Sequence, residues 1–271
     1  MNVLITGSTG FLGKEVSLAL KKKKFNIKYI SRKRYKSKNY IYCNLNNVRN
    51  LKHILNNFNA NVIVNLAAKV DFSNKFKNIY KINTHCPYEI AKICKKKKIH
   101  LIQASSILIN GQKRIYGRRT KYNPINHYEK SKLKAEFLIR KTKCNYTILR
   151  FGGIYGKNGP EHLGINKFIK LGTKGKKLIF EGNEKSLRNY IFVEDAANFI
   201  INCIENKKYG IFYVGGQIIS FEKMLKNINK TFCNKNEIIF SKNSIKKNDQ
   251  IIKTDKSVKF TSFKNSLKLL I

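Results

Sequence analysis

Near the start of the chain stands the sequence Thr6-Gly7-Ser8-Thr9-Gly10-Phe11-Leu12-Gly13, directly after the apolar run Val3-Leu4-Ile5. Glycines at this spacing permit a tight turn, close approach of the backbone to a pyrophosphate, and close packing of the following helix on the strand. The amides at the start of that helix attract negative charge. The sequence therefore predicts a strand, a dinucleotide-binding turn and a helix. The predicted cofactor contacts in this turn are Thr6, Gly7, Thr9, Gly10, Phe11, Leu12 and Gly13.

Beyond this turn, short apolar runs alternate with longer amphipathic stretches, a rhythm typical of a parallel sheet covered by helices. Strands are expected at residues 3–5, 27–30, 62–66, 100–104 and 146–151, and helices at 11–20, 48–58, 83–94 and 128–141. The fold class predicted is α/β, with a Rossmann-type doubly wound parallel sheet and a small C-terminal α/β substrate lobe. We expect an NAD(P)-binding domain at 1–151 and a smaller substrate-binding lobe at 152–271, parts of which return to the first domain.

The end of the second predicted strand bears on the choice of cofactor. In such folds an acidic side chain at this point binds the ribose 2′-hydroxyl of NAD. Here Ser31 and Arg32 occupy it, and Arg offers charge-assisted hydrogen bonds to a 2′-phosphate. The predicted cofactor is therefore NADP, with NAD as the alternative.

The net charge is the most unusual feature of the composition. In its 271 residues the chain has 56 Lys plus Arg against 15 Asp plus Glu, a formal charge of +41. Such a charge is typical of nucleic-acid-binding proteins, but the Lys- and Asn-rich composition without Trp also suits an AT-rich coding sequence. Lys21–Lys24 and Lys95–Lys98 are expected to be solvated helix ends, whereas Arg32–Lys38 and Arg114–Lys121 are kept as functional candidates. We therefore expect no specific nucleic-acid partner.

The cellular setting is inferred from three further features. The apolar runs, such as Phe199–Ile204, are much shorter than the roughly 18 residues that cross a bilayer. The six cysteines are scattered without a CxxC pair, as reduced thiols in a cytosol would be. With no signal peptide visible, we expect a cytoplasmic protein with no membrane association and no metal site.

Seven ordered motifs within residues 1–216 resemble the extended branch of the short-chain dehydrogenase/reductase superfamily, which contains sugar-nucleotide epimerases, dehydratases and reductases. The motifs are the glycine turn, Asn65-Leu66-Ala67-Ala68, Ile82-Asn83, Ala104-Ser105-Ser106 with Gly111, Tyr128-Glu129-Lys130-Ser131-Lys132, Leu149-Arg150-Phe151, and Arg188-Asn189-Tyr190-Ile191 with Val193-Glu194-Asp195. The resemblance implies hydride transfer between a nicotinamide and a sugar carbon.

A Tyr-x-x-x-Lys pair occurs three times in this Lys-rich chain, at Tyr29, Tyr88 and Tyr128. Only Tyr128 follows the Ser-Ser strand end and opens a helix, as the family pattern requires, and Lys132 shares its helix face. A nearby ammonium and an oxidised nicotinamide favour the phenolate, so Tyr128 is the predicted acid/base. The resemblance implies that Lys132 activates it and that Ser106 orients the reacting oxygen. The predicted catalytic residues are Ser106, Tyr128 and Lys132, of which Tyr128 and Lys132 also contact the cofactor.

Further binding residues follow from the resemblance alone. It implies cofactor contacts at Asn44, Leu45, Leu66, Ala67, Ala68 and Asn83. Arg188 is the predicted ligand of a nucleotide diphosphate, with a surface Arg as the alternative. Ser106 is the second predicted substrate contact, and homodimerisation is expected from the family.

The residues after Ser106 narrow the reaction. Family dehydratases carry an Asp-Glu pair there, whereas Ile107 and Leu108 cannot exchange protons, so 4,6-dehydration is disfavoured. Asn83–Tyr88 and Asn123–Tyr128 resemble the dTDP-4-dehydrorhamnose reductase type, while Arg188–Val193 resembles epimerases. We expect a reductase, or an epimerase with tightly bound NAD, acting on a nucleotide-linked sugar. The alternatives are an RNA-binding protein and a non-catalytic NADP sensor; substrate sugar, nucleotide and pathway stay open.

Overall fold

The computed structural model describes residues 1–70, 79–233, 237–241 and 246–271. The chain divides into two compact units. The first unit contains residues 1–111, 121–150 and 197–212, and the second contains 112–120, 151–196 and 213–271. Each unit is therefore built from separate stretches of sequence. The assignment of a cofactor-binding domain to 1–151 and a substrate-binding lobe to 152–271 stays a prediction.

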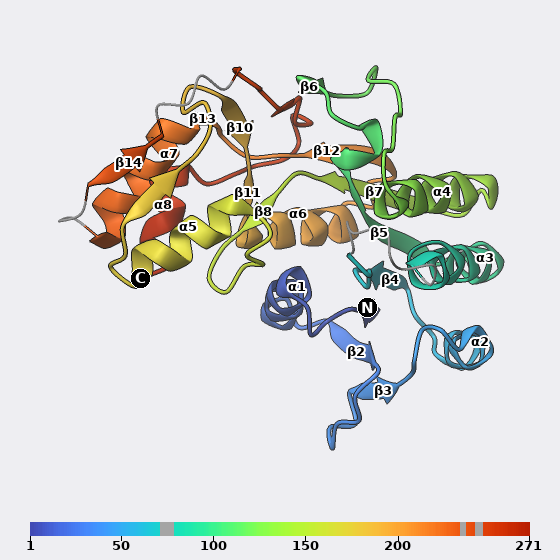
Figure 1. Cartoon of the computed structure of the whole chain (residues 1–271). Coiled ribbons are helices and arrows are strands. Elements are labelled where there is room, and N and C mark those ends of the chain that lie inside the picture. Colours follow the sequence, from blue (N-terminus) through green and yellow to red (C-terminus); the bar gives the residue numbers. More distant parts are fainter. Residues whose placement is uncertain (71–78, 234–236, 242–245) are drawn as a thin grey trace. The chain divides into compact units, whose positions relative to one another are not determined.

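A seven-stranded sheet is the framework of the first unit (Figure 1). Its strand order is β12-β7-β5-β4-β1-β2-β3, and the bounds are Gly210–Val214, Tyr146–Phe151, His100–Ser106, Val62–Asn65, Asn2–Thr6, Asn26–Ser31 and Tyr40–Tyr42. The pairs from β5 to β3 are parallel. The beginning of β7 bonds beside that of β5 through Leu101 and Asn145, and Gly152 after β7 bonds to Val214 at the end of β12. All seven strands thus begin at one edge of the sheet and end at the other.

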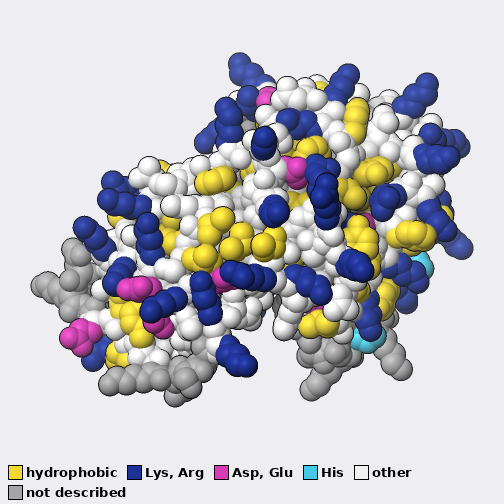
Figure 2. Space-filling model, turned by 90° about the horizontal axis from the view of Figure 1, so that it is seen from above, with side chains coloured by type: hydrophobic (Ala, Val, Ile, Leu, Met, Phe, Trp, Pro, Cys, Tyr) yellow, Lys and Arg dark blue, Asp and Glu magenta, His cyan; other side chains and the backbone are white. Residues whose placement is uncertain are grey.

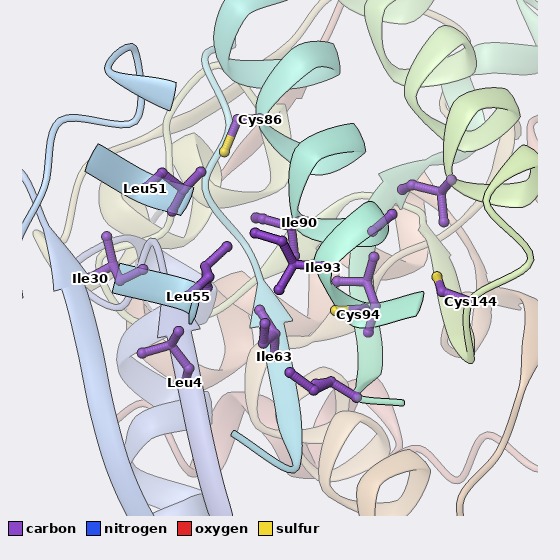
Figure 3. Close-up of a cluster of buried hydrophobic side chains, with 14 of the residues drawn as sticks. Leu4, Ile30, Leu51, Leu55, Ile63, Cys86, Ile90, Ile93, Cys94 and Cys144 are labelled. Carbon is purple, nitrogen blue, oxygen red and sulfur yellow. The ribbon is translucent and has the colours of Figure 1, made fainter. Parts of the chain in front are cut away.

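Helices cover both faces of this sheet. Figure 1 shows α2, α3 and α4 along one flank and α1 and α6 along the other. Their bounds are Phe11–Lys22 (α1), Val48–Asn57 (α2), Cys86–Lys97 (α3), His127–Lys141 (α4) and Val193–Glu205 (α6), with single turns at Lys81–His85 and Ile107–Asn110. Buried Ile, Leu and Cys side chains from the sheet, α2, α3 and α4 form one core, including Leu4, Leu51, Ile63, Ile90 and Cys94 (Figure 3). Burial of each such aliphatic side chain contributes about 1.5–3 kcal/mol.

The predicted α/β fold class is confirmed, with corrections to individual elements. The helix expected at 83–94 is wrong at its start, because Asn83 lies in a π turn and α3 begins only at Cys86, where Pro87 suits a first turn. The strand expected at 100–104 continues to Ser106. The short edge strand β3 was not predicted, since three half-exposed residues carry no clear periodicity.

Helices α1, α3, α4 and α6 are each followed, within two residues, by a lysine in the left-handed backbone region. These are Lys24, Lys98, Lys143 and Lys207, with φ between 45° and 57°. Glycine usually fills such a position after a helix because it has no Cβ. For a residue other than glycine the left-handed conformation costs roughly 1–2 kcal/mol. A cation at a helix C-terminus stabilises the helix by about 0.3–1 kcal/mol. The helix dipole therefore does not by itself offset the strain at these lysines.

The second unit is built from short strand pairs and helices. The pairs are β10 (Leu187–Asn189) with β13 (Ile218–Ser220), β11 (Ile191–Phe192) with β8 (Ile154–Tyr155), β14 (Ile238–Phe240) with β9 (Leu178–Phe180), and β15 (Ile251–Ile252) with β6 (Ile115–Tyr116). The helices are α5 (Gly164–Thr173), α7 (Phe221–Ile228) with the turn Asn229–Cys233, and α8 (Phe263–Lys268). The segment 112–120 thus joins this unit through β6.

Three observations concern the described residues as a whole. None of the described helices combines the length and apolar character that a membrane crossing requires. The five cysteines whose side chains are described are buried and free. No group of three or more His, Cys, Asp or Glu side chains able to hold a metal ion occurs in the described part of the chain.

Candidate active site

The glycine turn between β1 and α1 has the geometry of an anion-binding loop. Gly7 adopts a φ of +73°, and its carbonyl accepts a hydrogen bond from the Gly10 amide at 3.0 Å. Gly10 caps α1 with extended backbone and offers no side chain to the first helical amides. The first turn of α1 also contains no acidic residue. These amides therefore point a partial positive charge toward the loop.

Two glycines of the turn are required by close packing. A Cβ on Gly7 would lie 2.6 Å from the Ala67 amide nitrogen, and one on Gly13 would lie 2.1 Å from the Gly7 carbonyl oxygen. At Gly7 the turn packs directly against the residues after β4, and at Gly13 helix α1 packs directly against the turn. Any larger residue at either position would separate elements that the glycines allow to touch.

The turn has an unsatisfied polar group that fits a phosphate. The hydroxyl of Ser8 is buried and has no hydrogen-bond partner in the described structure. A buried hydroxyl without a partner costs free energy that a bound oxygen would recover. Ser8, the glycine backbone and the amides of α1 thus fit the pyrophosphate of a dinucleotide. Ser8 stands at a variable position of the motif, so the sequence pattern does not mark it.

The residues predicted to select the cofactor lie at the ends of β2 and β3. Ser31 is buried and its hydroxyl accepts the Lys33 amide at 3.0 Å, which turns the chain after β2. Arg32 is exposed, as is Asn44, whose side-chain oxygen accepts the Asn46 amide at 3.1 Å. Leu45 packs against the core instead of standing in solvent. Arg32 is therefore an exposed cation at the edge where the strands end.

A chain of buried hydrogen bonds crosses three neighbouring strands. The Thr6 hydroxyl donates to the Asn65 side-chain oxygen, and the Asn65 amide donates to Gln103 at 2.7 Å. Gln103 in turn donates to the Ala104 carbonyl at 2.8 Å. The Thr6 hydroxyl also accepts the Ala67 amide at 3.3 Å. The chain connects the glycine turn on β1 to the end of β5 in the low-dielectric interior, where such bonds are strong.

Lys132 of α4 donates to the same carbonyl. Its ammonium donates to Ala104 at 3.0 Å and lies 5.9 Å from the ring centre of Tyr128, one turn earlier on α4. Burial lowers the pKa of Lys132 to about 8, and the carboxylate of Glu136 opposes that change. Lys132 is thus a buried cation held beneath the Tyr128 ring at the end of β5.

Tyr128 is protonated in the chain without a bound nicotinamide. Burial, with a smaller contribution from the neighbouring Glu129 carboxylate, raises the pKa of Tyr128 to about 12. Tyr128 therefore holds its proton near neutral pH. The expectation that the Lys132 ammonium and an oxidised nicotinamide together favour the phenolate stays a prediction.

The two serines at the end of β5 have different surroundings. Ser105 donates to Glu136 at 2.5 Å and is fully engaged in the interior. Ser106 caps the short turn Ile107–Asn110, where its oxygen accepts the Leu108 amide at 3.2 Å. The Ser106 hydroxyl proton is not used by that contact. This arrangement leaves Ser106 as the serine that can donate to a substrate oxygen.

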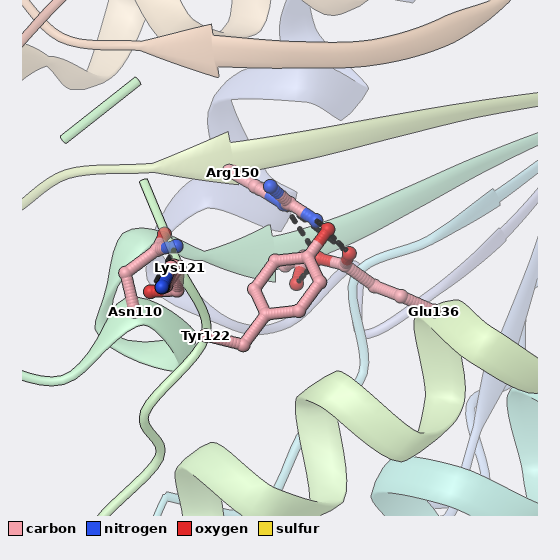
Figure 4. Close-up of polar contacts among 6 residues, drawn as sticks. Asn110, Lys121, Tyr122, Glu136 and Arg150 are labelled. Atoms are coloured by element: carbon pink, nitrogen blue, oxygen red, sulfur yellow. Dashed lines mark hydrogen bonds and ion pairs between the residues drawn. The ribbon is translucent and has the colours of Figure 1, made fainter. Parts of the chain in front are cut away.

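A buried ion pair fixes the next turn of α4 (Figure 4). Arg150 donates to both carboxylate oxygens of Glu136, with the shortest contact at 2.6 Å. The same guanidinium donates to the Tyr122 hydroxyl at 2.8 Å and stacks on its ring. A two-pronged pair of this kind restricts orientation as well as charge. Glu136 thereby links Ser105, Lys132 and Arg150.

Asn83 holds the segment after β4 against α4. Its side chain bonds both the amide and the carbonyl of Lys69 at 2.8 Å and donates to the Ser131 hydroxyl at 3.1 Å. Of the predicted residues in this segment, Leu66 bonds β1 through the Thr6 carbonyl, while Ala68 is exposed. Asn83 therefore positions the residue directly before Lys132.

Arg188 lies in the second unit and is held in one orientation. Its guanidinium donates to the carbonyls of Leu187 and Asn248 and stacks 5.1 Å from the Phe221 ring centre. Tyr190 lies close by, and its ring fills the space where a side chain at Gly153 would project. Burial raises the pKa of Tyr190 while the Arg188 charge opposes this. Arg188 is a half-buried, preoriented cation rather than a free surface side chain.

The basic segment 114–121 is neutralised more than its sequence indicates. Arg114 pairs with Asp249 at 3.4 Å and Arg118 with Asp255 at 2.7 Å, all within the second unit. These pairs join β6 and the following turn to the C-terminal segment. These two ion pairs give Arg114 and Arg118 a structural role within the basic segment.

Sequence reasoning missed Gln103 and the roles of Glu136 and Arg150. One signal was available for Glu136, because Tyr128, Lys132 and Glu136 follow each other at intervals of four on one helix face. Gln103 gave none, because its partners come from other strands.

The fold and the turn define a Rossmann-type nucleotide-binding protein with a Tyr-Lys pair at the sheet edge. Residues 1–236 match the family model described as the RmlD substrate binding domain. The chain belongs to this family, whose relatives are nucleotide-sugar epimerases, dehydratases and reductases.

Three individual comparisons indicate the range of that family. The dTDP-D-glucose 4,6-dehydratase of Dictyostelium discoideum is 28% identical over 237 residues, 71% of this chain and 53% of that protein. The chain thus spans about half the length of that relative. An ADP-L-glycero-D-manno-heptose-6-epimerase of Brachyspira hyodysenteriae is 27% identical, covering 85% of this chain and 81% of the relative. The dTDP-4-dehydrorhamnose reductase structure from Yersinia enterocolitica aligns with a TM-score of 0.80 at 22% identity, over 99% of this chain and 98% of that one, which shows the common fold.

Proposed function

We propose that this protein is an NAD(P)-dependent oxidoreductase or epimerase acting on a nucleotide-linked sugar. The observation that carries the proposal is the buried Lys132 ammonium, which lies beneath Tyr128 and bonds the end of β5 beside Ser106. A buried cation beside a tyrosine, at the edge of the sheet where a dinucleotide turn opens, is an arrangement for proton transfer next to a nicotinamide.

Within this proposal, each member of the triad has a separate task. Tyr128 holds its proton at neutral pH and donates it to a keto oxygen as negative charge develops there. Lys132 supplies positive charge that stabilises the resulting phenolate. Ser106 donates a hydrogen bond from its hydroxyl to the same substrate oxygen and orients it. The dinucleotide, when bound, supplies or accepts the hydride at C4 of the nicotinamide.

NADP is the proposed cofactor, and NAD is the alternative. The support is the exposed Arg32 at the end of β2, together with the absence of an acidic residue between Ser31 and Asn39. A guanidinium there binds a 2′-phosphate through charge-assisted hydrogen bonds, whereas it gains little from a ribose hydroxyl.

A nucleotide-linked sugar is the proposed substrate, with its diphosphate bound by Arg188. Support comes from the preorientation of the Arg188 guanidinium by two carbonyls and an aromatic ring. Replacing Arg188 by Ala should raise the Michaelis constant for the substrate by about tenfold or more, the loss of one charge-assisted hydrogen bond. An unaltered Michaelis constant in Arg188→Ala would remove this residue from the proposal.

Reduction and epimerisation are separated by one experiment. The purified protein is analysed for retained cofactor and then supplied with NADPH and a panel of nucleotide sugars, including 4-keto sugars. Consumption of NADPH supports the reductase, and retained NAD with interconversion of sugars but no net oxidation supports the epimerase. Neither activity with any nucleotide sugar would overturn the proposal. Elimination of water is not proposed, because Ile107 and Leu108 follow Ser106 without an acid or base.

We propose that the protein forms a homodimer and is cytoplasmic, because it resembles the family. Sedimentation equilibrium of the purified chain tests the dimer, since a single species at the mass of one chain would contradict it.

A further inference from the structure

The topology gathers a large group of lysines at one edge of the first unit. Helices α1, α3, α4 and α6 each run into a parallel strand, respectively β2, β5, β7 and β12. Since these strands begin at the same edge, the four helix ends lie there too. We call this the lysine edge; it comprises Lys21–Lys24, Lys95–Lys98, Lys141, Lys143, Lys207 and Lys208.

The lysine edge lies opposite the candidate active site within the first unit. The glycine turn, Asn65 and Ser106 stand where strands β1, β4 and β5 end, whereas the lysine edge stands where strands begin. A cofactor or sugar bound at the strand ends therefore does not use these lysines. The positive charge of the lysine edge therefore needs an explanation other than cofactor or sugar binding.

Positive charge at this edge is almost uncompensated. The acidic residue described at these helix ends is Glu205, which pairs with Lys23 at 2.9 Å across the ends of α1 and α6. The Lys97 ammonium donates to the carbonyls of Leu55 and Asn56 at the end of α2. Lysines and arginines are spread over the visible surface in Figure 2 as well, with few acidic groups among them. What distinguishes the lysine edge is therefore its backbone, not the presence of charge alone.

The backbone singles out four of these lysines. Lys24, Lys98, Lys143 and Lys207 are exposed and hold left-handed φ angles. After Lys24, Lys98 and Lys207 the chain closes its helix with the hydrogen bond that usually accompanies a glycine, from Phe25 to Leu20, from Ile99 to Cys94 and from Lys208 to Cys203. After Lys143 the Cys144 amide bonds the Thr142 hydroxyl instead. Four unfavourable choices at equivalent places are an outlier that calls for a functional explanation.

An exposed aromatic ring stands in the same edge. Tyr209 is 48% exposed, follows Lys207 and Lys208, and is steadied by an edge contact with the His100 ring at 4.8 Å. A tyrosine among lysines offers a stacking surface to a base, in addition to the attraction of the lysines for phosphate. Because tyrosines also occur at membrane interfaces, the test below includes vesicles beside the oligonucleotide.

The length of the edge fits a polymer rather than a mononucleotide. From β12 to β2 the sheet has five inter-strand steps, which at about 4.8 Å each span roughly 24 Å. A stacked strand with a rise of about 3.4 Å would place roughly seven nucleotides along that distance. We propose that the lysine edge binds single-stranded nucleic acid through its phosphate backbone, without sequence specificity, with Tyr209 as a stacking platform.

The test compares two variants with the same change in net charge. The edge variant K24Q/K98Q/K143Q/K207Q removes the four left-handed lysines. The control variant K167Q/K174Q/K223Q/K264Q removes four exposed lysines of the second unit. Binding of the full chain to a fluorescent twelve-nucleotide oligouridylate is measured by anisotropy between about 50 and 200 mM KCl.

Wild type and the control variant should bind alike, while the edge variant binds at least about tenfold more weakly at the low-salt end. Because each phosphate contact contributes a slope of about −0.7 in log K against log salt, the edge variant's slope should be shallower by up to about 2.8. Tyr209→Leu should weaken oligouridylate binding by about fivefold or more, with no change in the slope.

Three outcomes would overturn the proposal. Equal loss in both lysine variants would mean that overall charge, not this edge, attracts RNA. If the wild type did not bind the oligouridylate at low salt, single-stranded nucleic acid would be excluded as the partner. If the edge variant lost binding to phosphatidylserine vesicles while keeping the oligouridylate, the partner would be a membrane.

A second variant separates function from folding. K24G/K98G/K143G/K207G removes the same charges and also relieves the left-handed backbone, so it should unfold at a higher denaturant concentration than the wild type. It should nevertheless bind oligouridylate as weakly as the edge variant. Full binding by this variant would exclude a role for the lysine side chains.

Discussion

The ammonium of Lys132 and the backbone carbonyl of Ala104 share a hydrogen bond of 3.0 Å. The Gln103 side chain donates to the same oxygen at 2.8 Å. Two donors from different elements therefore fix the end of β5 one residue before Ser105. This contact joins α4, which carries Tyr128, to the polar chain that reaches the glycine turn.

Replacing Tyr128 by Phe should abolish turnover while cofactor binding is retained. Loss of a general acid costs about a hundredfold to ten-thousandfold in rate, and the phenyl ring keeps the packing. Steady-state rates and titration of NADPH fluorescence measure the two effects. Tyr88→Phe is the matched control, since Tyr88 also precedes a lysine by four residues. Full activity of Tyr128→Phe would refute the assignment.

Lys132 should contribute an increase in the free energy of unfolding between pH 8 and pH 10. The ordinary pKa of a lysine is 10.5, and burial lowers that of Lys132 to about 8 in the folded chain. Between these values the unfolded chain binds more protons than the folded one, so stability increases with pH, by about 2 to 3 kcal/mol. Below pH 8 both states are protonated and the contribution stays constant.

Urea titrations of the wild type and Lys132→Met across this range test the lysine directly. The variant should lack the rise, because methionine does not titrate. The raised pKa values of the buried cysteines lower the stability of both proteins from about pH 9, and that of Tyr128 does so above pH 10, so the difference between the two profiles measures Lys132. Parallel pH profiles for the two proteins would contradict the burial of a charged Lys132.

Replacing Arg32 by Ala should reduce discrimination between NADPH and NADH. Loss of a charge-assisted hydrogen bond raises the Michaelis constant for NADPH by about tenfold to a hundredfold and leaves that for NADH nearly unchanged. Arg49→Ala, at an exposed position on α2, controls for the loss of one positive charge. Equal Michaelis constants for both cofactors in the wild type would count against NADP.

Gly13→Ala should destabilise the first unit and weaken dinucleotide binding together. Its Cβ would lie 2.1 Å from the Gly7 carbonyl oxygen, so α1 must move away from the turn. Overpacking of this kind costs about 1–3 kcal/mol. Gly164→Ala is the control, because its Cβ meets only the flexible Phe168 ring at 3.9 Å. Equal thermal stability of the two variants would show that the turn can relax.

The Glu136–Arg150 pair should behave as a unit. Glu136→Leu leaves a buried guanidinium uncompensated, which costs about 3–5 kcal/mol. The double variant Glu136→Leu/Arg150→Met should recover most of this loss. Denaturant unfolding of the four proteins gives the coupling free energy, and strictly additive losses would mean that the pair contributes nothing beyond its parts.

Much of the first unit was predictable because its signals are local. The glycine turn, the strand at 146–151 and the helix carrying Tyr128 lie at or within a residue or two of their predicted bounds, since periodicity and capping act over a few residues. Asn126, for example, caps α4 by accepting the Glu129 amide. The chain's local sequence was less informative where elements are short, as at β3 and in the second unit.

The sequence by itself determined the doubly wound fold and the dinucleotide turn, because each depends on residue types at fixed local spacing. The prediction of Tyr128 over two competing tyrosines needed the resemblance of its surroundings to the family, because the spacing occurs three times. Only the tertiary structure decided how Gln103, Lys132 and Ala104 meet, why Tyr128 keeps its proton, and that four lysines share one edge in left-handed conformations. Contacts between distant strands, and the burial that shifts a pKa, exist only after the chain has folded, so no local pattern carries them.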